Sequence, residues 1–159
     1  MSKNPIDSEK GGIMNYLNIE LYGIDEEGNS KTFKLQDFIG NNVVLYFYPQ
    51  DDTPVCTQEA LDFQEFSDIF PESTIIIGVS ADSIESHLEF QNKHKLNFIL
   101  LADPKNELKN EFENTDKYIT NLHRGTFVLD KTGKIVKFWD KVDIDGHVKE
   151  VAEFVKTLQ

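Results

Sequence analysis

The chain has 159 residues, of which 39% are hydrophobic and 12 are Phe, so it can bury one core, while 28 acidic against 16 basic residues leave a net charge of −12. Such a charge repels phosphate backbones and anionic lipid headgroups, which argues against binding to nucleic acid or to a membrane surface. No apolar stretch approaches the roughly 20 residues of a membrane-spanning helix, and the first residues lack the apolar centre of a secretory signal.

The first 15 residues are polar and show no hydrophobic periodicity, which predicts a flexible lead-in over residues 1–15. No internal repeat, low-complexity segment or linker follows, so we expect one domain over residues 16–159. Within it, residues 16–21 alternate partly like a strand, the turn-rich segment GIDEEGNS comes next, and residues 31–35 resemble a second short strand. This pattern predicts an N-terminal β-hairpin.

Three apolar runs follow, at residues 43–48, 73–80 and 97–102. The first is continuous, as in a strand that is buried on both faces of a sheet, and we expect it to be the central strand. Residues 84–96 carry apolar side chains among polar ones and are predicted to form a helix. This alternation of strands and helices indicates an α/β sheet with right-handed crossovers.

The C-terminal third has shorter elements. Residues 104–114 are predicted to form a short polar helix, and residues 125–130 and 135–140, joined by the turn KTGK, are predicted to form a second hairpin. Asp145 is expected to cap the last helix. The apolar positions of that helix follow the helical period and are Val148, Val151, Ala152, Val155 and Leu158.

The segment between the predicted central strand and the next helix contains a helix-start pattern. Thr53 is a good N-cap and Pro54 suits the first helical position, so Cys56 is expected at the third position, inside the first turn. There the unpaired backbone N–H groups and the positive end of the helix dipole favour a thiolate over a thiol. The same helical face carries apolar side chains, namely Ala60, Phe63 and Phe70. Cys56 should therefore lie at the edge of the core, at the bottom of a partly shielded pocket.

Cys56 is the only cysteine, so it cannot close a disulfide within the chain, and a Cys-x-x-Cys redox or zinc motif is excluded. A lone cysteine fits a reducing compartment, and we expect the cytoplasm. Most lone cysteines are small buried hydrophobic residues. However, the end of a buried strand that leads into a helix N-terminus is where open α/β sheets bind their ligands. Position alone leaves both interpretations open.

Arg124 is the only arginine among the 16 basic residues and stands just before the strand predicted at 125–130. A guanidinium stays charged and offers a fork of donors, which would stabilise a neighbouring thiolate and hold the oxygen atoms of a substrate in line for attack. The alternative is a surface ion pair in a chain rich in Asp and Glu. The position of Arg124 in the sequence does not exclude this alternative.

Over residues 16–158 the chain resembles the peroxiredoxins, and in particular the bacterioferritin comigratory protein (PrxQ-type) subfamily. Pro49, Thr53 and Cys56 fill the family signature Pro-x-x-x-Thr-x-x-Cys within the segment YFYPQDDTPVCTQEA. The later segments RGTFVLDKTGKIVKFW and DGHVKEVAEFV also resemble the subfamily. The first of these two places Arg124 at the catalytic arginine of the family.

The resemblance implies a thioredoxin-like α/β fold, with a central mixed sheet flanked by helices, and neither a cofactor nor a metal ion. It implies a thiol-dependent peroxidase that reduces hydrogen peroxide and organic hydroperoxides through a sulfenic acid at Cys56. Thr53 would hydrogen-bond the thiolate and the peroxide, Pro49 would shield the pocket, and Arg124 would polarise both reactants. Glu59 stands where the subfamily commonly has an acidic residue near the site.

Two positions depart from the subfamily pattern. Many members carry a resolving cysteine five residues after the peroxidatic one, where this chain has Leu61, and Val55 replaces the usual glycine. Without a second cysteine, the sulfenic acid at Cys56 must be reduced by a thiol of another molecule: glutathione, a thioredoxin-like or glutaredoxin-like protein, or a second copy of the chain. The resemblance also implies a monomer or a weak homodimer.

Two other classes of function are alternatives. In a redox sensor, oxidised Cys56 would form a mixed disulfide with a partner protein, and turnover would be incidental. A catalytically inactive binding module is disfavoured because the signature residues and Arg124 are all present. The histidines are expected on the surface rather than at a metal site, because only the first two share a predicted helix and their spacing offers no chelate. They are His87, His94, His123 and His147.

Overall fold

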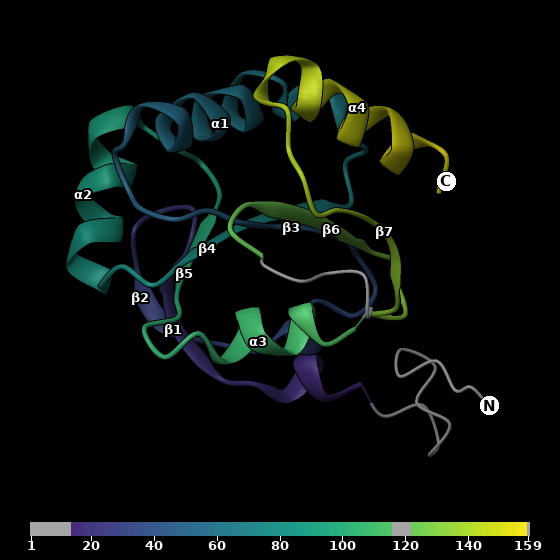
Figure 1. The fold of residues 1–159 in the computed structure, drawn as a ribbon, viewed down its shortest axis with the longest axis horizontal. Coiled ribbons are helices and arrows are strands. Elements are labelled where there is room, and N and C mark those ends of the chain that lie inside the picture. Colours follow the sequence, from purple (N-terminus) through teal and green to yellow (C-terminus); the bar gives the residue numbers. More distant parts are fainter. Residues whose placement is uncertain (1–13, 116–121, 159) are drawn as a thin grey trace.

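The computed structural model describes residues 14–115 and 122–158 of the chain. Over these residues the chain forms a seven-stranded sheet with helices on both faces (Figure 1). The lead-in expected over residues 1–15 falls almost entirely on residues 1–13, which lie outside the described residues. Among the described residues, no helix is long and apolar enough to cross a membrane.

The strands lie in the order β2-β1-β5-β4-β3-β6-β7. The three inner strands β5, β4 and β3 run parallel to one another. At one edge β1 is antiparallel to β5 and β2, and at the other β6 is antiparallel to β3 and β7. The bounds are β1 Leu21–Ile24, β2 Ser30–Phe33, β3 Asn42–Phe47, β4 Thr74–Ser80, β5 Ile99–Ala102, β6 Gly125–Leu129 and β7 Ile135–Trp139. The mixed sheet agrees with the predicted α/β class. The strand in the middle is β4, however, and β3, which was expected there, lies beside it.

The helices form two layers. α1, α2 and α4 cover one face of the sheet, and α3 covers the other together with two short 3₁₀ helices, as Figure 1 shows. The bounds are α1 Pro54–Glu65, α2 Ile84–His94, α3 Glu107–Glu113 and α4 Ile144–Lys156, with 3₁₀ helices at Asn15–Asn18, Leu35–Phe38 and Ser67–Ile69. The helices predicted from the sequence are therefore present, with shifts of a few residues at their ends.

β3 connects the two cores of the molecule. Val43, Leu45 and Phe47 belong to the core under α3, whereas Val44 and Tyr46 belong to the core under α1 and α4. Side chains alternate between the faces of a strand, so a strand covered on both sides needs apolar residues at every position. The continuous apolar run thus explains why β3 is fully buried, and its C-terminal end leads directly into the turn before α1.

The N-terminal hairpin exists, but the strand predicted at residues 16–21 is wrong. Residues Asn15–Asn18 form a 3₁₀ helix, and β1 starts at Leu21. Tyr16 and Leu17 are both buried although they are adjacent, which a half-exposed strand does not allow, and the Tyr16 hydroxyl donates to the carbonyl of Gly133 over 2.8 Å. Packing against the distant turn at Gly133 therefore overrides the local alternation.

The last helix also begins differently from the prediction. The capping side chain is Asp143, whose Oδ1 accepts from the backbone N–H of Asp145 over 3.2 Å, and not Asp145 itself. Gly146 has a φ of 83°, so the helix has an irregular first turn that requires a residue tolerant of positive φ. Beyond it, four of the predicted apolar positions are buried and the fifth packs partly against the same core; they are Val148, Val151, Ala152, Val155 and Leu158.

Candidate active site

The turn after β3 delivers the start of α1 as the residue pattern predicts. Thr53 is the N-cap in extended conformation, Pro54 is the first helical residue, and Cys56 occupies the third position. The Thr53 side chain forms no capping bond; its hydroxyl donates to the carbonyl of Gln50 over 3.1 Å instead. The Thr53 hydroxyl therefore leaves the N–H groups of the first turn available to another acceptor, such as a thiolate or a bound substrate.

Cys56 is buried at the end of the core under α1, with an exposed fraction of 1%. It belongs to the same apolar cluster as the predicted neighbours Ala60, Phe63 and Phe70. Phe70 lies beyond the end of α1 but still packs in this cluster. The Sγ atom accepts a hydrogen bond from Nη2 of Arg124 over 3.1 Å. The sulfur is thus surrounded by apolar side chains and accepts a hydrogen bond from a cationic group.

Sheet pairing explains why Arg124 reaches Cys56. β6 pairs antiparallel with β3, and Gly125 lies opposite Phe47, so the residue before β6 lies beside the turn that follows β3. Arg124 also donates from Nη1 to Oε1 of Glu59 over 2.7 Å. The alternative of a surface ion pair is wrong, because the Glu59 side chain is fully buried and that of Arg124 is 14% exposed.

Glu59 holds the second branch of the guanidinium. It lies one helical turn after Cys56, on the buried face of α1. Burial raises the pKa of the Glu59 carboxyl to about 7, and the neighbouring Arg124 opposes this rise. Its other oxygen, Oε2, is buried without a hydrogen-bond partner among the described residues, and so is the hydroxyl of Tyr46. The carboxylate therefore has Arg124 as its one charged partner among these residues, and any change in its charge acts directly on the arginine.

The remaining predicted residues lie around this core of the site. Pro49 is exposed and lines a cavity of about 220 Å³ at the ends of β3 and β4, together with His123, the neighbour of Arg124. Val55 is 48% exposed, on the outer side of the first helical turn. Leu61, at the position of the resolving cysteine in many relatives, is half-buried and packs against the core. The predicted residues thus meet in one place, with Pro49 and Val55 at its periphery.

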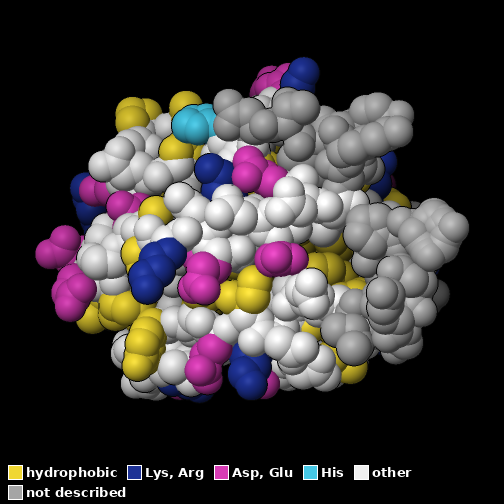
Figure 2. Space-filling model, turned by 60° about the horizontal axis from the view of Figure 1, so that its bottom comes forward, with side chains coloured by type: hydrophobic (Ala, Val, Ile, Leu, Met, Phe, Trp, Pro, Cys, Tyr) yellow, Lys and Arg dark blue, Asp and Glu magenta, His cyan; other side chains and the backbone are white. Residues whose placement is uncertain are grey.

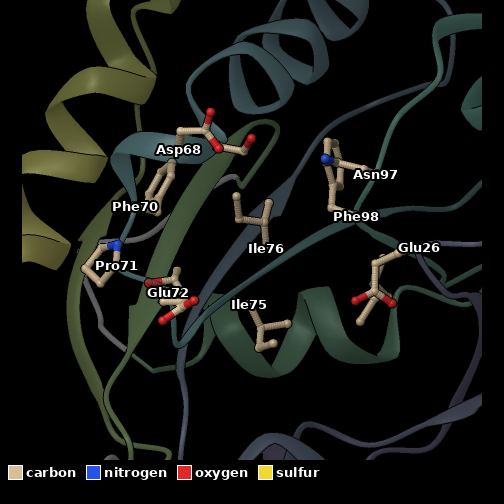
Figure 3. A pocket seen from close by; sticks show the side chains of 12 residues that line it. Glu26, Asp68, Phe70, Pro71, Glu72, Ile75, Ile76, Asn97 and Phe98 are labelled. Atoms are coloured by element: carbon tan, nitrogen blue, oxygen red, sulfur yellow. The ribbon is translucent and has the colours of Figure 1, made fainter.

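A second cavity, of about 460 Å³, lies at the opposite end of β4 (Figure 3). Its lining includes Ile75 and Ile76 of β4 and three carboxylates, those of Glu26, Asp68 and Glu72. It is larger than the cavity beside Pro49, but none of the residues predicted for the site lines it. Size alone therefore does not identify the reactive site in this molecule.

Two buried histidines with polar partners were not predicted from the sequence. The expectation that all histidines lie on the surface is wrong for His87 and His147, which are 0% and 3% exposed. His87 contacts Asp51, and His147 contacts the hydroxyl of Thr126 over 2.8 Å; burial lowers the pKa of His147 to about 4. A signal existed for His87, which lies three residues before the buried Phe90 and so shares its helical face.

Comparisons with known proteins identify the family of the chain. The model of the AhpC/TSA family matches residues 17–138. Peroxiredoxin Bcp of Bacillus subtilis is 42% identical over 137 residues, which cover 82% of this chain and 87% of the relative. The chloroplastic peroxiredoxin Q of Sedum lineare is 36% identical over 138 residues, which cover 85% and 73%.

Solved structures are similar over nearly the whole chain. The bacterioferritin comigratory protein of Xanthomonas campestris, studied for its alkyl peroxide reduction activity, superposes with a TM-score of 0.78 at 31% identity, over 89% of this chain and 92% of that one. A PrxQ variant from Xylella fastidiosa superposes with a TM-score of 0.80 at 31% identity, over 91% and 92%. These likenesses confirm the predicted fold class.

Proposed function

The chain belongs to the AhpC/TSA family, and to the Bcp/PrxQ group of peroxiredoxins within it, and we infer that Cys56 is its peroxidatic residue. It has the thioredoxin-like fold of that family and is an oxidoreductase, a thiol-dependent peroxidase. The observation that carries the inference is the hydrogen bond from Arg124 to the only sulfur nucleophile of the chain, at the start of α1. The site residues and their roles below are our proposal.

The first half of the reaction is the attack of the Cys56 thiolate on the terminal oxygen of a hydroperoxide. An S–O bond forms, the O–O bond breaks, and the leaving alkoxide or hydroxide takes up a proton and departs as an alcohol or water. The sulfur loses two electrons to the peroxide and becomes a sulfenic acid. Arg124 stabilises the thiolate and the charge that develops on the leaving oxygen.

Thr53 has a more specific role than capping the helix. Its hydroxyl proton is directed to the carbonyl of Gln50, so its oxygen lone pairs are available to accept a hydrogen bond from the O–H of the bound hydroperoxide. The N–H groups of the first turn of α1 would donate hydrogen bonds to the leaving oxygen of the peroxide, on which negative charge develops. Pro49 would limit the access of water from the side of the neighbouring cavity.

The second half of the reaction needs an external thiol because the chain has one cysteine. A thiol attacks the sulfenic sulfur, water leaves, and a mixed disulfide forms; a second thiol then releases Cys56 in its reduced form. Glutathione, a thioredoxin-like or glutaredoxin-like protein, and a second copy of the chain all supply this chemistry. Because Cys56 is 1% exposed, a protein reductant requires the first turn of α1 to open.

A reductant screen tests this cycle. The purified chain is supplied with hydrogen peroxide or an organic hydroperoxide and with each thiol in turn, and peroxide consumption is followed. Sustained turnover with at least one thiol supports the one-cysteine peroxidase cycle. A single stoichiometric oxidation with every thiol would instead favour the redox-sensor alternative, in which oxidised Cys56 is passed to a partner protein.

We further propose that the protein acts in the cytoplasm as a monomer or weak homodimer. The lone reduced cysteine supports the compartment, and cell fractionation tests it. Figure 2 shows a face on which acidic, basic and apolar groups are mixed. In the part of the chain that the structure describes, the large exposed hydrophobic residues lie in separate segments: Tyr22 in β1, Ile39 just after a 3₁₀ helix, and Val55 in α1. Light scattering after size-exclusion chromatography tests the oligomeric state.

A further inference from the structure

A buried carboxylate anchors the turn that carries the signature residues. We call residues 48–53 the signature turn. Asp51 lies within it, and its side chain is 3% exposed. Its Oδ1 accepts from the hydroxyl of Tyr48 over 2.6 Å, and its Oδ2 accepts from the hydroxyl of Ser86 over 2.8 Å. Oδ2 also lies 2.7 Å from Nδ1 of His87. Ser86 and His87 both belong to α2, so Asp51 connects the signature turn to this helix.

His87 extends this anchor to the sheet. Its side chain is fully buried, and its Nε2 lies 2.8 Å from the carbonyl oxygen of Leu101 in β5. A carbonyl only accepts, so Nε2 carries a hydrogen, and one further proton lies between Nδ1 and the Asp51 carboxylate. Each polar atom of this buried pair has a partner, which removes the cost of leaving it unpaired and favours one geometry.

The backbone of the turn is constrained as well. The N–H of Asp51 donates to Oδ2 of Asp82 over 2.7 Å, and the same oxygen accepts from the hydroxyl of Ser80 at the end of β4. The next residue, Asp52, has a φ of 59°, a left-handed conformation that costs free energy in a residue with a side chain. Such a conformation persists where its surroundings determine it, and Thr53 follows it directly.

We propose that Asp51 and His87 are positioning residues for the peroxide reaction. They fix the signature turn to α2 and β5, so that the Thr53 hydroxyl and the first N–H groups of α1 are set for the hydroperoxide before it binds. The proposal rests on the function proposed for Thr53 and Cys56. Asp51 and His87 make polar contacts that join the turn to α2 and β5, whereas Ala60 and Phe63 provide apolar packing around Cys56. Loosening the pair is therefore expected to shift the turn while these two apolar side chains stay in place.

The test compares two reactions of Cys56 in matched variants. Oxidation by hydrogen peroxide depends on the geometry of the turn, whereas alkylation by iodoacetamide depends on the thiolate and its exposure. His87→Gln keeps a donor for the Leu101 carbonyl but loses the contact with Asp51. We expect its second-order rate constant for oxidation to fall by roughly tenfold or more, since small misplacements of reacting groups are costly, while the rate of alkylation stays close to that of the wild type.

The control is His94→Asn, a change in the same helix at the histidine that contacts Asp52 over 3.0 Å. Asp52 is 40% exposed, so this pair is screened by solvent, and its loss should leave oxidation within about twofold of wild type. Tyr48→Phe removes one hydroxyl from the Asp51 cluster and preserves the ring, and therefore provides a mild second variant that retains the packing of the core. We expect it to slow oxidation in the same selective way.

Three results with the variants would overturn the proposal. One is oxidation at the wild-type rate in both His87→Gln and Tyr48→Phe. Another is slower oxidation together with a clear change in the alkylation rate, in either direction, which indicates a general change of structure around the buried Cys56. The third is an equal effect of His94→Asn. Slow oxidation of the wild-type chain itself would overturn the role of Cys56 and the positioning proposal together, so the two failures are distinguishable.

Discussion

Arg124 donates a hydrogen bond to the Sγ atom of Cys56 over 3.1 Å, although 68 positions separate the two residues in the chain. The pairing of β6 with β3 brings them together, and the buried Glu59 holds the other branch of the guanidinium at 2.7 Å. The arginine therefore approaches the sulfur in one orientation, which a flexible surface cation does not achieve.

Replacement of the arginine by lysine tests this fork. In Arg124→Lys a single ammonium group cannot contact both Glu59 and the sulfur in the observed geometry. We expect the rate constant for oxidation of Cys56 by hydrogen peroxide to fall by roughly 100-fold, the usual cost of losing one donor to a developing charge. Stopped-flow measurements with the reduced chain give this rate constant directly. A value within a few-fold of wild type would show that the fork is unnecessary.

The Thr53 hydroxyl is tested by a pair of variants. Thr53→Val keeps the shape of the side chain but removes the acceptor for the peroxide O–H, whereas Thr53→Ser keeps the hydroxyl. We expect oxidation to slow by roughly tenfold or more in the valine variant and to stay near the wild-type rate in the serine variant, consistent with the loss of one hydrogen bond in the reacting complex. Equal rates in the two variants would remove Thr53 from the mechanism.

Glu59 makes the rate of oxidation depend on pH. Since burial raises the pKa of its carboxyl to about 7, the group is neutral below that pH and pairs with Arg124 as a carboxylate above it. The charged carboxylate holds the guanidinium in place more firmly than the neutral acid does, so the ratio of the wild-type oxidation rate to that of Glu59→Gln should rise as the pH increases through about 7. Rates measured in both proteins across this range give the ratio, and a ratio that does not vary with pH contradicts the coupling.

The same carboxyl affects stability with the opposite dependence. The folded pKa of about 7 exceeds the unfolded value of 4.5, so between these pH values the folded chain holds a proton that the unfolded chain has lost. The free energy of unfolding of wild type, relative to Glu59→Gln, should decrease as the pH rises through this window. Urea unfolding of both proteins at several pH values within it measures the difference. A difference that grows with pH would contradict the assignment.

His147 has the reverse effect on stability. Its folded pKa of about 4 lies below the unfolded value of 6.5, because the ring is buried beside Thr126. The unfolded chain therefore binds more protons between these values, and the free energy of unfolding should fall as the pH decreases through the window. His147→Gln should remove this part of the acid sensitivity in urea unfolding curves. An unchanged slope in the variant would exclude His147 as its source.

Features of the site that depend on neighbouring residues could be predicted from the sequence, whereas contacts between residues far apart in the chain could not. Thr53, Pro54 and Cys56 were placed correctly because a helix start is determined by neighbouring residues. Arg124 could be singled out because it is the only arginine, and the family resemblance placed Glu59 near the site, but the pairing of the two residues was not predicted. The contact depends on sheet register, which a local pattern does not contain.

The errors have the same physical origin. His87 was expected on the surface because a histidine among polar residues looks solvated, yet Asp51, 36 positions away, provides a buried partner. Residues 16–21 alternate like a strand, yet Tyr16 is drawn into a 3₁₀ helix by its bond to Gly133, 117 positions away. In both cases a distant polar partner, and not the intrinsic preference of the segment, decides the structure.

The peroxidatic role of Cys56 is tested most directly by trapping the product of the first step. The reduced chain is mixed with one equivalent of hydrogen peroxide in the presence of dimedone, which reacts with sulfenic acids, and the adduct is mapped by mass spectrometry. We expect one adduct per chain, on Cys56, and no peroxidase activity in Cys56→Ser with any thiol that supports the wild type. Turnover that persists in Cys56→Ser would contradict it.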